Sequence, residues 1–109
     1  MLALSVVAAE EHHHDEGEAV AIKGEVVDLA CYIDHGAKGD KHAGCAQKCI
    51  ESGLPVGLKA EDGKTYVVIG QHEPMNKTLA PLAGKTVTLK GKVVSRDGLN
   101  MIANAELVK

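Results

Sequence analysis

The sequence predicts a small, mainly-β domain: a five-stranded Greek-key barrel with a helical insert between its first two strands. Several stretches alternate apolar and polar residues and are rich in β-branched side chains. Gly, Pro and Asp-Gly signals separate these stretches. One insert, residues 31–53, contains a segment with helical character and carries all 3 cysteines of the chain. At 109 residues the chain forms one domain at most.

The first nine residues, MLALSVVAA, are apolar and end in small side chains. This pattern is typical of the last part of a secretory signal, so residues 1–9 predict a signal-peptide remnant with cleavage before Glu10. The run is too short to span a membrane. The alternative is a short apolar strand. We expect export to the periplasm or the extracellular space, where disulfides are permitted.

Residues 10–18, EEHHHDEGE, are polar and charged without apolar periodicity, which predicts a flexible acidic and histidine-rich tail. Cleavage after Ala9 would make His12 the third residue of the mature chain. In that position it could bind copper(II) or nickel(II) in a square plane, with His13 and His14 as weaker ligands. The alternative is a solvated polar tail or part of an expression tag.

The folded domain is expected to span residues 19–109. The stretch AVAIKGEVVDLA (19–30) alternates with a period of two and predicts the first strand. Residues 39–52 predict a helix, with Asp40 as its cap and Gly53 at its end. Further strands are expected at 55–60, 64–70, 85–95 and 99–108, with a short helical or irregular connection at 75–84.

Five strands in this order, with a partly helical connection between the third and the fourth, are expected of a barrel of the oligonucleotide/oligosaccharide-binding (OB) type. Gly24 and Gly91 lie inside predicted strands, where glycine usually costs stability. We interpret both as points at which a long barrel strand bends.

The insert between the first two strands (residues 31–53) carries the chemistry. On a helix, His42, Cys45 and Cys49 share one face. Cys31, at the expected end of the first strand, and His35 could add ligands from the facing loop, and Asp34 and Asp40 could support them. Cys and His together select copper or zinc. The predicted metal ligands are Cys31, His35, His42, Cys45, Cys49 and, from downstream, His72.

Two other interpretations of the cysteines stay open. A disulfide between Cys31 and either Cys45 or Cys49 would join the insert to the barrel and stabilise it by roughly 2–4 kcal/mol. Thiol redox catalysis is the other, although the C-x2-C motif that such enzymes usually carry is absent from the sequence.

Composition bears on the class of function. The chain has no Trp or Phe, 2 Tyr and a formal net charge of -3, which disfavours nucleic acid as a partner. No combination of nucleophile, base and acid stands out, so we expect no enzyme. We expect an exported, non-enzymatic metal-binding protein for transport, storage, electron transfer or structural closure. The alternative is a structural module with a disulfide-stapled insert that self-associates or binds a protein partner.

The stretch GEVVDLACYIDHGAKGDKHAGCAQKCIESGLPVGL, followed by GKTYVVIG and LAGKTVTLKGKVVSRDGL, resembles a group of small, exported, uncharacterised bacterial proteins. The most specific pieces are Cys31-Tyr32, His35-Gly36, His42 and Cys45-Ala46-x-x-Cys49. The resemblance covers about 90 residues and implies an OB-like barrel and export. It implies no defined activity, so the functional interpretation rests on ligand chemistry.

Overall fold

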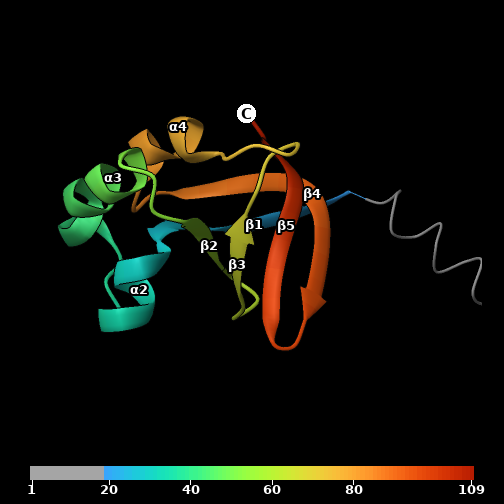
Figure 1. Ribbon diagram of the computed structural model, residues 1–109, viewed down its shortest axis with the longest axis horizontal. Coiled ribbons are helices and arrows are strands. Elements are labelled where there is room, and N and C mark those ends of the chain that lie inside the picture. Colours follow the sequence, from blue (N-terminus) through green and yellow to red (C-terminus); the bar gives the residue numbers. More distant parts are fainter. Residues whose placement is uncertain (1–18) are drawn as a thin grey trace, which may run out of the picture.

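The computed structural model describes residues 19–109, and in this part of the chain five strands form a closed barrel accompanied by a few short helices (Figure 1). Around the barrel the strand order is β1-β2-β3-β5-β4. The β3–β5 pair is parallel and the other pairs are antiparallel. The predictions of a mainly-β fold and of five strands are confirmed. The strands are β1 (Val20–Asp28), β2 (Val56–Ala60), β3 (Thr65–Val68), β4 (Thr86–Arg96) and β5 (Leu99–Leu107).

Strand β1 closes the barrel because its two halves pair with different neighbours. Residues 24–28 pair with β2, and residues 20–25 pair with β4. Gly24 belongs to both registers, and a Cβ atom there would lie 2.5 Å from the carbonyl oxygen of Lys59 and 2.7 Å from the Cα of Ala60. Glycine therefore permits the close approach of two backbones at this point. Gly91 in β4 lies at a shift in the register with β5.

The helices occupy two connections. Between β1 and β2 the chain forms α2 (Leu29–His35), the 3₁₀ turn η1 (Asp40–His42) and α3 (Ala43–Glu51). Between β3 and β4 it forms α4 (Asn76–Leu79) and η2 (Ala80–Leu82). In Figure 1, α2 and α3 lie at the same end of the barrel. The stretch 39–52, predicted as one helix, contains η1 and α3.

Two local predictions in this region were wrong. The first strand stops at Asp28 and not at residue 30, because Asp28 caps a helix that the sequence analysis did not predict: its side chain accepts a hydrogen bond from the Ala30 amide. Asp40 caps nothing through its side chain. The residues at the starts of η1 and α3 are Gly39 and His42, and neither makes a side-chain capping bond.

The core is aliphatic, apart from the buried Tyr66, and extends from the barrel into the helices. Ile50 of α3 and Leu79 of α4 are fully buried with barrel residues such as Leu58. The amide of Asn76 donates hydrogen bonds to the carbonyl oxygens of Ile50, at 2.9 Å, and Leu54, at 2.7 Å. These bonds fix the C-terminal end of α3 against α4. No helix within residues 19–109 combines the length and the apolar character needed to cross a membrane.

Replacement of two glycines tests this packing. Gly24→Ala should lower the free energy of unfolding by about 2 kcal/mol, because the new methyl group meets backbone atoms that cannot move aside. Gly44→Ala should raise it by about 0.5 kcal/mol, since Gly44 lies in α3 with open space around it and alanine favours helix. Urea unfolding of both variants measures the difference. Equal stability of the two variants would contradict the described contact at Gly24.

Candidate metal site

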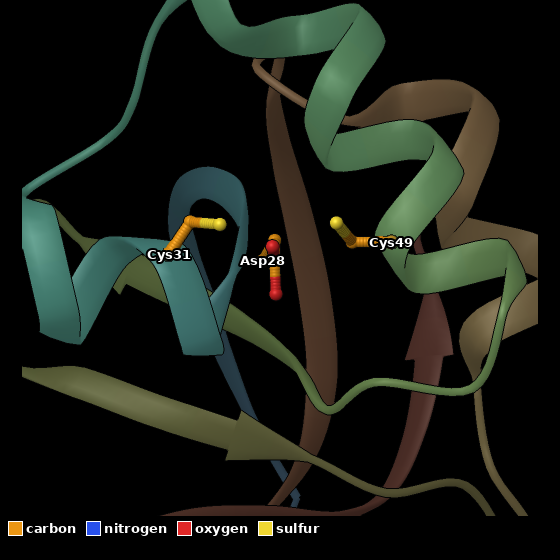
Figure 2. Close-up of side chains that lie close together, drawn as sticks. All are labelled: Asp28, Cys31 and Cys49. Atoms are coloured by element: carbon orange, nitrogen blue, oxygen red, sulfur yellow. The ribbon is translucent and has the colours of Figure 1, made fainter.

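Three side chains converge between α2 and α3, beside the end of β1 (Figure 2). Asp28 is the last residue of β1, Cys31 lies in α2 and Cys49 lies in α3. One carboxylate oxygen of Asp28 and the two sulfur atoms all lie within 4.8 Å of one another. In Figure 2 the two thiols point toward each other with the carboxylate between them. We call these three residues the Asp28 cluster, and their donor atoms form a group of the kind that binds a metal ion.

The carboxylate of Asp28 is buried, with an exposed fraction of 2%. Its Oδ1 accepts a hydrogen bond of 3.1 Å from the Ala30 amide, as the N-cap of α2. Its Oδ2 is buried and has no hydrogen-bond partner. A buried acceptor without a partner costs about 1–3 kcal/mol. A cation bound to Oδ2 would remove that cost.

The carboxylate and the burial of the cluster both favour protonated thiols. The nearby carboxylate of Asp28, together with burial, raises the pKa of Cys31 to about 11. Burial, and secondarily the contact with Asp28, raises the pKa of Cys49. A bound dication would reverse this effect, because it stabilises thiolate over thiol.

The structure brings together Cys31 and Cys49 from the set of predicted ligands. A pocket of about 260 Å³ adjoins them, and its lining includes Asp28 and Cys31 together with His35, His42 and Cys45. His35 is exposed, and its Nε2 lies 3.2 Å from a carboxylate oxygen of Asp34. All three cysteines are free thiols, so neither predicted disulfide is formed in this structure.

The remaining predicted ligands lie elsewhere. His72 is exposed in the turn after β3 and lines neither the cluster nor the pocket. His12, His13 and His14 lie outside the described residues.

Sequence reasoning missed Asp28 because it placed Cys31 at the end of a strand. In the structure Cys31 is the third residue of α2 and Asp28 is the residue before that helix. A capping side chain folds back over the first turn and reaches the third helical residue. The spacing Asp-x-x-Cys would therefore have indicated the contact, had the helix been predicted.

Comparisons with protein-family models, with curated proteins and with solved structures found no match. The Asp28 cluster and its surroundings are therefore the features from which a function can be inferred.

The contact between Asp28 and Cys31 can be tested in metal-free protein. In the wild type, alkylation of Cys31 by iodoacetamide should accelerate toward a plateau only as the pH approaches about 11, because the thiolate is the reactive form. Asp28→Asn removes the negative charge but keeps a capping side chain, so the pKa of Cys31 should fall and alkylation at pH 8 should become faster. Peptide mass spectrometry measures modification at each cysteine, with the exposed Cys45 as an internal reference. An unchanged Cys31 profile in Asp28→Asn would contradict the contact.

Proposed function

We propose that this protein is an exported, non-enzymatic metal-binding protein that holds one zinc ion in the Asp28 cluster. The observation that carries the proposal is the buried carboxylate of Asp28, whose Oδ2 has no hydrogen-bond partner and of which one oxygen lies within 4.8 Å of the sulfur atoms of Cys31 and Cys49. With both thiols deprotonated, the cluster offers three negative charges to a cation. An ion at this position would satisfy the carboxylate and offset the burial of those charges.

Zinc suits these ligands better than copper does. Thiolates alone suit both zinc and copper(I), whereas carboxylates are hard ligands that copper(I) binds poorly. Zinc accepts thiolate sulfur, imidazole nitrogen and carboxylate oxygen in one tetrahedral site. The Asp28 cluster supplies three ligands, and the histidines that line the neighbouring pocket, or a water molecule, would supply a fourth. Copper is the second candidate for the bound ion, and a measurement of the metal content of the exported protein distinguishes it from zinc.

We also infer that the barrel is of the OB type. The supporting features are five strands, the order β1-β2-β3-β5-β4, and a first strand that pairs along its two halves with β2 and β4. In that fold the connection between the first two strands is one of the usual binding regions. The Asp28 cluster lies at that connection, which supports a binding role. An assembly role through free strand edges has less support, because each described strand pairs with a neighbour on both sides.

Zinc binding has a direct test. We expect one zinc ion per chain after dialysis, and a loss of affinity of about 100-fold or more in Cys31→Ser and Cys49→Ser. His72→Asn should bind zinc as the wild type does, since His72 lies outside the cluster and asparagine tolerates its positive φ of 58°. Competition with a chromogenic chelator measures the affinities, and plasma mass spectrometry measures the metal content.

Either of two outcomes would contradict the site as proposed. One is wild-type protein that retains no metal after dialysis. The other is a loss of affinity in His72→Asn as large as that in Cys31→Ser, which would place the ligands elsewhere.

Export is proposed from residues 1–18, which lie outside the described part of the chain. Cleavage after Ala9 predicts a mature protein that begins at Glu10. Intact mass spectrometry of untagged protein from the periplasmic and culture fractions should therefore give the mass of residues 10–109. Recovery of the full-length mass in the cytoplasm alone would contradict export.

A further inference from the structure

We propose that Cys31 and Cys49 are the site of a reversible oxidative crosslink, and that this disulfide and the bound zinc ion are alternative ways of joining α2 to α3. This inference rests on the proposed function, because the disulfide consumes two of the three zinc ligands of the Asp28 cluster. The oxidant is an organic disulfide, R–S–S–R, which thiol–disulfide exchange reduces to two thiols.

The two sulfur atoms are already close to bonding distance. They lie within 4.8 Å of each other, and in Figure 2 the thiols of Cys31 and Cys49 point toward each other from α2 and α3. A disulfide bond is about 2.05 Å long, so the sulfurs must approach by less than about 3 Å. Both residues are half-buried, so neither is fully shielded from an oxidant in solution.

Helix α2 is the element that can make this movement. Leu29, at its start, is its only buried residue, and the rest of the helix is exposed or half-buried. By contrast, α3 is fixed by its fully buried Ile50, whose carbonyl oxygen accepts a hydrogen bond from Asn76. A small shift of α2 about Leu29 would therefore bring Cys31 to Cys49 without disturbing the core.

The third cysteine does not fit this crosslink. Cys45 lies on α3, one turn before Cys49, and is exposed. It does not belong to the group of donor atoms that lie within 4.8 Å of one another. Of the two pairings with Cys31 that the sequence left open, the geometry favours Cys49, and Cys45 stays a free thiol.

The crosslink forms in two exchange steps. The thiolate of one cysteine attacks a sulfur of R–S–S–R, which gives a mixed disulfide and releases the first R–SH. The thiolate of the other cysteine then attacks the protein sulfur of the mixed disulfide, which forms the Cys31–Cys49 bond and releases the second R–SH. Two electrons pass from the protein to the oxidant, and the two thiol protons end on the two R–SH molecules.

Zinc takes no part in this electron transfer. A thiolate binds a metal ion, whereas the sulfurs of a disulfide carry no negative charge with which to hold it. The zinc ion therefore leaves as Zn²⁺ when the crosslink forms, and reduction of the disulfide restores the site. Zinc binding at the Asp28 cluster thus becomes dependent on the thiol–disulfide balance of the surroundings.

Glutathione disulfide is the oxidant in the test, applied to wild-type protein with and without zinc sulfate. In metal-free protein we expect an intramolecular disulfide that peptide mass spectrometry maps to Cys31 and Cys49, with Cys45 still free. With free zinc at about 100 times its dissociation constant, about 1% of the protein is metal-free, so the crosslink should form about 100-fold more slowly. In protein loaded with one equivalent of zinc, a chromogenic indicator should record one zinc ion released per disulfide.

Cys45→Ser is the matched control. It removes the exposed thiol that lies outside the Asp28 cluster, so the crosslink and its protection by zinc should both match those of the wild type.

The outcomes separate this inference from the proposed function. A disulfide that maps to Cys45, or no intramolecular disulfide in excess glutathione disulfide, would overturn the inference, while zinc binding by the wild type would leave the proposed function standing. Equal rates of crosslinking with and without saturating zinc would also overturn it. A Cys31–Cys49 disulfide in protein that binds no zinc at equilibrium would overturn the proposed function, and with it the alternation between zinc and disulfide.

Discussion

The Asp28 carboxylate lies where β1 ends and α2 begins, and each of its oxygens has a different structural role. Oδ1 caps the new helix through the Ala30 amide, and Oδ2 is buried without a hydrogen-bond partner, in a carboxylate that lies beside the thiols of Cys31 and Cys49. The capping bond turns the chain out of the barrel and places Cys31 in the first turn of α2. The position of the cluster, the protonation of its thiols and the site we propose all follow from this one buried side chain.

The barrel and its helices supply the rigidity that the cluster needs. The main neighbour of α2 is β1, whereas α3 packs against β1, α4 and η2 and is anchored by Ile50 and Asn76. A metal bound by Cys31 and Cys49 would join α2 to α3 directly and close the loop between them. We therefore expect metal binding to be coupled to stability, as in other small domains in which a metal compensates for a limited hydrophobic core.

The parts of the fold that depend on local pattern could be predicted from the sequence. The alternation of side chains in β1 and β4, the Asp62-Gly63 turn between β2 and β3, and the end of α3 at Gly53 all have short-range signals. The start of α2 has no such short-range signal, because the stretch that forms β1 continues in apolar residues through Leu29 and Ala30. Propensity favours a longer strand there, and the structure instead buries Leu29 against Gly57 and caps the helix with Asp28.

The part of the candidate site that depends on short-range spacing could also be predicted from the sequence. The shared helical face of Cys45 and Cys49, and the proximity of Cys31 to that helix, follow from spacing and chain topology. The role of Asp28 depends on tertiary burial, which leaves Oδ2 without a hydrogen-bond partner and brings two thiols from different helices close to the carboxylate. Spacing alone could not separate the side chains of the cluster from those that line the neighbouring pocket.

The central claim is that two thiolates and one carboxylate bind the same ion, and X-ray absorption at the metal edge of the loaded protein tests it most directly. For zinc, the account predicts two sulfur neighbours at about 2.3 Å and oxygen or nitrogen neighbours at about 2.0–2.2 Å. A first shell without sulfur, or one with three sulfur atoms, would contradict the assignment of Asp28, Cys31 and Cys49 as the site.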